Sequence, residues 1–255
     1  MKKPLILIVN DDGITAPGIK ALKEVAEKIG KVIVVAPDSP QSGMGHAITL
    51  NKPLRLHESK VFEDTKAYEC SGTPVDCVKI AVNQVLSRKP DLCISGINHG
   101  SNSSINIIYS GTMSAAVEAA LEGIPSVGFS LLDYNWEADF SEAKKYVEII
   151  IKQILENKLK KNTLLNVNIP ARSSEPIKGI KICRQANANW EEKFDERKDP
   201  FERSYYWLTG KFVNYDQGND TDEWALKNNY VSVVPVQFDL TAYKGIDFIN
   251  KNWNL

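Results

Sequence analysis

Apolar residues along the first two thirds of the chain follow two alternating patterns. Residues 5–9 form a short continuous apolar run, which is typical of a strand covered on both faces, and further strands are predicted at 32–36, 92–94, 126–132 and 164–168. Between them, apolar residues recur at helical spacing, as at Ile19, Leu22, Val25, Ala26 and Ile29. Strands that alternate with helices predict an α/β fold with a mostly parallel sheet and helices on both faces.

Residues that favour helix ends agree with this pattern. Pro17 is expected in the first turn of the first helix, and Gly30 at its end. Thr73-Pro74-Val75-Asp76 has the cap, proline and acidic residue of a helix start, and an apolar stripe continues to Val85. Further helices are predicted at 112–121, which is rich in alanine, and from Ser141.

Tryptophan and clustered aromatic residues become more frequent after residue 185. Four of the five tryptophans lie beyond this point, together with the cluster Tyr205-Tyr206-Trp207. We therefore divide the chain into a core, residues 1–185, and a C-terminal arm, residues 186–255. Aromatic side chains on such an arm are expected to bury against the core, a partner subunit, or both.

Composition excludes several classes of protein. The chain has 31 Lys and Arg against 32 Asp and Glu, and 43% of its residues are hydrophobic, so it is neither disordered nor built to coat nucleic acid. The four cysteines form no Cys-x-x-Cys pair and are expected to be buried free thiols. The apolar run at residues 5–9 is too short for a secretory signal, and no run is long enough for a membrane span. We expect a soluble, cytoplasmic protein.

The candidate chemistry begins at Asn10-Asp11-Asp12-Gly13, directly after the first strand. Ligands bind at this edge of open parallel sheets. Two adjacent carboxylates repel each other unless positive charge lies beside them, and a hard divalent cation is the simplest source. The alternative is a solvated turn in which Asp12 caps the next helix, and the sequence leaves both interpretations open.

Three more polar loops are predicted at the same edge, at residues 36–43, 95–102 and 110–112. Ser110-Gly111-Thr112 opens a helix, so its N–H groups and hydroxyls suit an anion such as phosphate. The oxygen-rich set suits Mg²⁺, Mn²⁺ or Ca²⁺ better than Zn²⁺. His99 falls on one of these loops and His46 lies just beyond another, and both are candidates for substrate contact; there is no Gly-x-Ser-x-Gly or Gly-x-Gly-x-x-Gly motif.

These residues resemble the motif series of the SurE survival-protein family, whose members are metal-dependent 5'-nucleotidases. The resemblance spans nearly the whole chain. It rests on the segments Ile8-Val9-Asn10-Asp11-Asp12-Gly13-Ile14, Ala36-Pro37-Asp38, Gln41-Ser42-Gly43, Gly72-Thr73-Pro74-Val75-Asp76-Cys77-Val78, Ser95-Gly96-Ile97-Asn98-His99-Gly100, Tyr109-Ser110-Gly111-Thr112, Asn166-Val167-Asn168-Ile169-Pro170 and Tyr230-Val231-Ser232-Val233-Val234-Pro235, with Asp239-Leu240-Thr241 beyond.

The resemblance implies a phosphoric monoester hydrolase that splits nucleoside 5'-monophosphates. It implies one divalent cation per subunit, Mg²⁺ or Mn²⁺ with Ca²⁺ as a substitute in a crystal, held by Asp11, Asp12, Ser42 and Asn98. Asp11, Asp12 and Asn98 would act in catalysis. The phosphate would be surrounded by Asn102, Ser110, Gly111 and Thr112.

The resemblance also implies a Rossmann-like core and a β-rich and helical arm exchanged between subunits of a homodimer or homotetramer. No nucleic-acid duplex and no membrane is expected as a partner. The stretch Ser39-Pro40 is neutral where the family commonly has a longer or arginine-containing segment, so no nucleobase preference is transferred. Polyphosphate as a second substrate, and water or Asp11 as the nucleophile, stay open. A nucleotide-binding regulator and a scaffold built on the aromatic arm are the rival classes.

Overall fold

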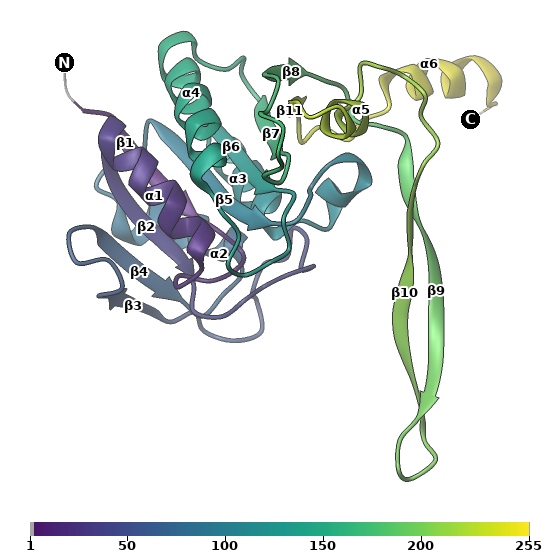
Figure 1. Cartoon of the computed structure of the whole chain (residues 1–255), viewed down its shortest axis with the longest axis horizontal. Helices are drawn as coiled ribbons and strands as arrows, with labels where there is room; N and C mark the ends of the chain where they lie inside the picture. The colour runs from purple at the N-terminus through teal and green to yellow at the C-terminus, as the bar shows by residue number, and fades with distance from the viewer. Residues whose placement is uncertain (1–2, 255) are drawn as a thin grey trace.

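The computed structural model describes residues 3–254 and contains a nine-stranded sheet in the order β3-β4-β2-β1-β5-β6-β7-β11-β8 (Figure 1). The strands are β1 (Leu5–Val9), β2 (Lys31–Pro37), β3 (Leu56–Ser59), β4 (Lys66–Cys70), β5 (Leu92–His99), β6 (Ser126–Leu131), β7 (Leu164–Ile169), β8 (Ile180–Ile182) and β11 (Val231–Val236). The six strands from β4 to β7 in this order pair in parallel, as the alternating pattern predicts.

The order of the strands places a ligand-binding crevice beside β1. The chain passes from β1 to β2 on one side, and β5 pairs with β1 on the other. Strand order reverses at this point, and in open parallel sheets the loops that leave the carboxyl ends of such strands form a crevice. Residues 10–13 leave β1 at this crevice.

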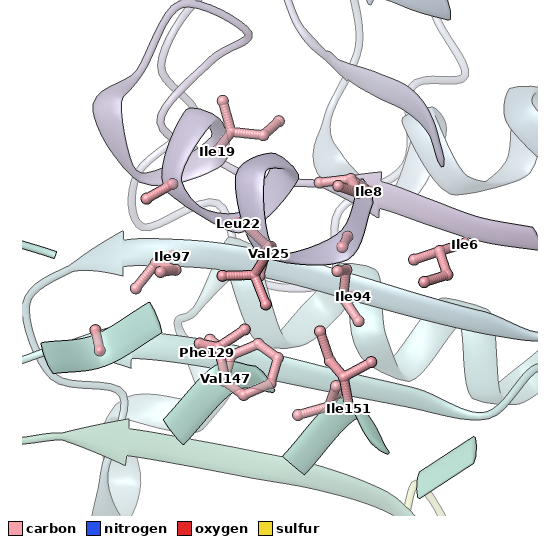
Figure 2. Close-up of a cluster of buried hydrophobic side chains, with 14 of the residues drawn as sticks. Ile6, Ile8, Ile19, Leu22, Val25, Ile94, Ile97, Phe129, Val147 and Ile151 are labelled. Carbon is pink, nitrogen blue, oxygen red and sulfur yellow. The ribbon is translucent and has the colours of Figure 1, made fainter. Parts of the chain in front are cut away.

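Helices cover both faces of the sheet, which explains why the central strand β1 is apolar throughout. Ile6 and Ile8 of β1 pack with helices α1 (Pro17–Ile29) and α4 (Ser141–Asn157), and Figure 2 shows this cluster. Leu5, Leu7 and Val9 face the other way, toward α2 (Pro74–Ile80) and α3 (Gly111–Leu121). Successive residues of a strand point to opposite faces, so a strand between two helical layers needs an unbroken apolar run.

Several local predictions are confirmed. Pro17 occupies the first helical turn of α1, and Thr73 and Asp76 form a capping box at the start of α2. Ala16, with no side-chain cap, precedes α1, so Asp12 does not cap this helix. The four cysteines are buried and free.

Two local predictions are wrong. The apolar stripe that starts at Val75 predicts one helix to Val85, but α2 ends at Ile80 and residues Ala81–Val85 form the π-helical turn η1. The strand predicted at 92–94 continues as β5 to His99, where a loop was expected, because pairing with β6 resumes after a bulge between Ser95 and Asn98. Gly96, at φ +118°, supplies the backbone conformation that this bulge uses.

The C-terminal segment contributes to the sheet and also leaves it. Strand β11 pairs antiparallel with β7, and α5 (Asp222–Lys227) packs against it. Strands β9 (Ala188–Lys198) and β10 (Ser204–Asn214) form a separate two-stranded hairpin that extends away from the core, and α6 (Tyr243–Asn252) follows β11 (Figure 1). The division at residue 185 and exchange between subunits stay predictions.

No helix within residues 3–254 combines the length and apolar character needed to cross a membrane.

Candidate metal and phosphate site

A cavity of about 340 Å³ lies at the carboxyl ends of β1 and β5, and it collects most of the residues that the sequence singled out. Asp11, Asp12, Ser42, Asn98, Asn102 and Ser110 all line it. They come from the loop after β1, the loop after β2, the end of β5 and the start of α3, so chain segments about 100 residues apart meet in one place.

Asp11 is the most confined member of the site. It is 4% exposed, and the hydroxyl of Thr112 donates to its Oδ1 at 2.5 Å. Burial and the neighbouring charge of Asp12 raise the pKa of Asp11 from 3.8 to about 6, although the hydrogen bonds from Thr112 act in the opposite direction. The ionised form of Asp11 is therefore short of compensating positive charge.

Asp12 lies beside it at the mouth of the cavity. Burial raises the pKa of Asp12, and the backbone N–H of His99, which donates to Asp12 Oδ2 at 3.4 Å, acts in the opposite direction. Among the ion pairs formed within residues 3–254, none involves Asp11 or Asp12. The two carboxylates thus share one cavity without a basic side chain between them.

The remaining oxygen donors come from β5 and from the loop after β2. Asn98 fixes its side chain by donating from Nδ2 to the carbonyl of Gly100 at 2.9 Å. Ser42 is exposed, and its loop is joined to the site because the N–H of Gln41 donates to the carbonyl of Asp11 at 2.7 Å. The described residues contain no group of three or more His, Cys, Asp or Glu suited to a metal, so a cation here would use two carboxylates with hydroxyl and amide oxygens.

Asn102 is held by a buried polar network that the sequence did not reveal. Its N–H donates to Asn168 Oδ1 and its Nδ2 to Ser130 Oγ, both at 2.8 Å. Asn166 donates to the carbonyl of Asn102 and accepts from Asn168. The Asn166-Val167-Asn168 motif is thus a support for Asn102.

The three residues of the Ser110-Gly111-Thr112 turn have different roles. Ser110 lines the cavity and caps α3 by accepting from the N–H of Met113 at 3.0 Å. Thr112 is fully buried behind Asp11. Gly111 packs directly against Asp11, since a Cβ at this position would lie 2.7 Å from Asp11 Cβ. The start of α3 therefore holds Asp11 in place as well as facing the cavity.

The two rim histidines have different surroundings. His99 lines the cavity, where its ring stacks on Trp136 at 5.6 Å and meets Phe140 edge-on. His46 is not part of the cavity lining; its Nε2 lies 3.0 Å from Oε2 of Glu118, a buried carboxylate that also pairs with Lys79. His46 therefore joins the loop that carries Ser42 to helix α3.

Four further residues line the cavity and were missed from the sequence, namely Asn106, Tyr109, Tyr134 and Trp190. Trp190 lies at the base of the hairpin. It is one of the four tryptophans that follow residue 185, but only the folded chain shows that it reaches the site. Tyr134 follows β6 in a segment that no motif distinguishes.

Comparisons with known proteins identify the family of this chain. A model of the family described as "Survival protein SurE" matches residues 6–192. A protein of Flavobacterium psychrophilum called "5'-nucleotidase SurE" is 64% identical, over 100% of this chain and 99% of its own length. One of the same name from Bacteroides fragilis is 45% identical, over 100% and 99%.

Among solved structures, the SurE protein from Aquifex aeolicus superimposes with a TM-score of 0.84 at 41% sequence identity, covering 97% of this chain and 99% of its own. A family match of this extent, with relatives identical at nearly half or more of their positions, settles the family. This chain belongs to the SurE survival-protein family.

Proposed function

We propose that this protein is a divalent-metal-dependent 5'-nucleotidase, which hydrolyses nucleoside 5'-monophosphates to nucleoside and phosphate. The observation that carries the proposal is the pair Asp11 and Asp12, set in one cavity with hydroxyl and amide groups. Membership of the SurE family supports it, as do the relatives that are called 5'-nucleotidase SurE. Phosphoric monoester hydrolysis is the reaction that this name describes.

The residues present fit a hard cation. Asp11 is buried, its pKa is raised to about 6, and neither it nor Asp12 pairs with a basic side chain among residues 3–254. Asp11, Asp12, Ser42 and Asn98 would hold one Mg²⁺ or Mn²⁺ per subunit, with Ca²⁺ as a substitute in a crystal. Such a cation, when bound, neutralises negative charge on phosphoryl oxygens.

The chain's own groups would position the substrate and the nucleophile. Asn102 and Ser110, which line the cavity, would contact the phosphate, and Gly111 lies next to Ser110 against Asp11. Asp11, fixed by Thr112, would orient a water molecule whose oxygen adds to phosphorus and gives up one proton, while the bond from phosphorus to the 5' oxygen breaks and that oxygen gains one proton, so that no net proton is consumed. Direct attack by Asp11 to form an aspartyl-phosphate is the alternative, and trapping a phosphoryl-enzyme during turnover would establish it.

The arm supports a proposal about assembly. The hairpin exposes a row of aromatic and aliphatic side chains, including Tyr206, Trp207 and Leu208, each more than half exposed. Surfaces of this kind usually bury against another chain. We propose that residues 186–255 mediate a homodimer or homotetramer, and light scattering on the purified protein measures this directly.

Phosphate release tests the activity. We expect release from adenosine and guanosine 5'-monophosphates that stops with a chelator and returns with Mg²⁺ or Mn²⁺. A regulator would bind AMP without releasing phosphate, and a scaffold would do neither, so either result would contradict the proposal. Tripolyphosphate assayed beside the nucleotides decides whether short polyphosphate is a second substrate.

A further inference from the structure

The cavity has aromatic rings in its lining in addition to its carboxylates. Tyr134 and Trp190 both line it, and they are 77% and 41% exposed. They come from distant segments, one after β6 and one at the base of the β9–β10 hairpin (Figure 1). The site that presents carboxylate and amide groups therefore also presents apolar ring surface to whatever binds there.

Trp190 is held in position by two contacts. Its Nε1 donates to Oδ1 of Asn106 at 2.8 Å, and Asn106 also lines the cavity. Its ring meets Phe212 of β10 edge-on, with centroids 5.6 Å apart. The hydrogen bond satisfies the polar edge of the indole, so the ring is fixed at the site with much of its surface accessible.

Tyr134 packs against the backbone of the turn that follows β5. A Cβ added to Gly100 would lie 2.3 Å from the Tyr134 ring, so this ring packs directly on Gly100. Gly100 has φ +98° and accepts the hydrogen bond from Asn98. The ring of Tyr134 is therefore placed by the same turn that fixes a candidate metal ligand.

From these contacts we infer that Tyr134 and Trp190 form a stacking surface for the nucleobase of the substrate, while its phosphate lies at Asp11, Asp12 and Asn102. This inference rests on the proposed function and adds the part of the nucleotide that the carboxylates cannot recognise. Every base has a π-face, so stacking on fixed rings holds purines and pyrimidines without selecting one. A cavity of about 340 Å³ falls in the range of small-ligand sites.

The test compares substrates with and without a base. We expect Trp190→Leu and Tyr134→Leu each to lower the ratio of kcat/KM for AMP to kcat/KM for ribose 5-phosphate by about tenfold, chiefly through KM for AMP. Trp190→Phe and Tyr134→Phe retain a ring and should keep most of the ratio. Phe201→Leu, on an exposed side chain at the hairpin tip, is the matched control and should keep all of it.

Three results would overturn the inference. The Leu variants could lose kcat/KM equally on both substrates, which indicates a structural role, or they could leave the ratio unchanged. The third is a wild-type protein that does not distinguish AMP from ribose 5-phosphate. Calorimetry with adenosine gives a readout that needs no hydrolysis. Weaker adenosine binding in the Leu variants supports the stacking surface even where no phosphate is released, whereas absent hydrolysis of both substrates contradicts the proposed function alone.

Discussion

Asp11 is a carboxylate whose ionised form is disfavoured by its surroundings. Its pKa rises from 3.8 to about 6 because it is buried beside Asp12. In the metal-free protein, the contribution of Asp11 to the free energy of unfolding is most favourable below about pH 4, and it is lost as the pH rises through about 6. The shift in pKa lowers the free energy of unfolding by roughly 3 kcal/mol at neutral pH.

We therefore predict that Asp11→Asn stabilises the metal-free protein at about pH 7.5 while it removes activity. Asparagine keeps the shape of the side chain but carries no charge to bury. Urea unfolding in the presence of a chelator, at about pH 4.5 and pH 7.5, measures the effect. The gain should be largest at the higher pH, fall to about a third of that value at the lower pH, and be absent in the exposed control Asp38→Asn; a variant less stable than wild type at both values would contradict the argument.

Thr112 gives a second test at this scale. Its hydroxyl holds Asp11 at 2.5 Å from inside the protein, so Thr112→Val removes a buried donor to a carboxylate. We expect kcat for AMP to fall by about tenfold or more, and Thr112→Ser, which keeps the hydroxyl, to retain most of it. Equal kinetics in the two variants would show that the hydrogen bond is unimportant.

The sequence predicts which side chains gather at the site better than it predicts how they are held. The pair Asp11-Asp12 stands at the end of an obvious strand, so its place at the sheet edge follows from the pattern alone. The bond from Thr112 to Asp11 joins residues 101 positions apart, and the stacking of His99 on Trp136 joins segments that no motif connects. Such contacts depend on tertiary packing, which local patterns do not encode.

At the scale of elements, strand β7 holds Asn102 in position, and β11 pairs with β7. Asn168 of β7 accepts from the N–H of Asn102, and Ser232 lies beside it in β11 with a buried hydroxyl that has no partner among the described residues. Asn168→Leu should leave the Asn102 N–H unsatisfied and cost about 1–3 kcal/mol of unfolding free energy.

Asn168→Leu should also lower AMP hydrolysis, because Asn102 loses its support. Ser232→Ala is the matched control at the neighbouring strand position, and it should change neither stability nor rate by much, since its hydroxyl makes no hydrogen bond. Urea unfolding and steady-state kinetics on both variants decide this. If Ser232→Ala is as damaging as Asn168→Leu, strand packing and not the asparagine network supports the site.

Helix α3 holds the loop of Ser42 through an ion pair between Glu118 and His46. Glu118 in α3 is buried and pairs with His46 of that loop and with Lys79 of α2. Glu118→Leu should release the loop and raise the Mn²⁺ concentration needed for half-maximal activity by several fold, with little change in the maximal rate. The control Glu122→Gln changes the residue directly after α3, four positions beyond Glu118, and should leave this concentration unchanged. A fall in maximal rate alone would argue against the loop as the affected part.

The main elements follow from sequence patterns because their causes are local. Strand β1 is apolar throughout because helices pack on both faces, and Pro17 and Thr73 start helices through their own chemistry. The continuation of β5 to His99 depends on pairing with β6, and the place of β11 beside β7 depends on a partner far away in the sequence. Pairing between distant segments is what the pattern of one segment cannot specify.

At the scale of the whole molecule, the hairpin is the feature that the single chain does not explain by itself. Strands β9 and β10 contact each other along eleven residues each, and their side chains are largely exposed. We predict that replacing Trp207 and Leu208 together by serine shifts the molar mass measured by light scattering toward that of one chain. An unchanged mass would place the subunit interface elsewhere or show that the protein is a monomer.

Our proposal joins the scales: the fold brings Ser42 and Asn98 to the adjacent Asp11 and Asp12, and we propose that these residues hold a cation that nucleotide hydrolysis requires. The most direct test is the rate of phosphate release from AMP by metal-free protein as Mn²⁺ is added, with Asp11→Asn measured in parallel. We predict that the wild-type rate rises from background to a plateau, and that the variant stays about a thousandfold or more below it. A full rate in excess chelator, or a variant that reaches the wild-type plateau, would contradict the account.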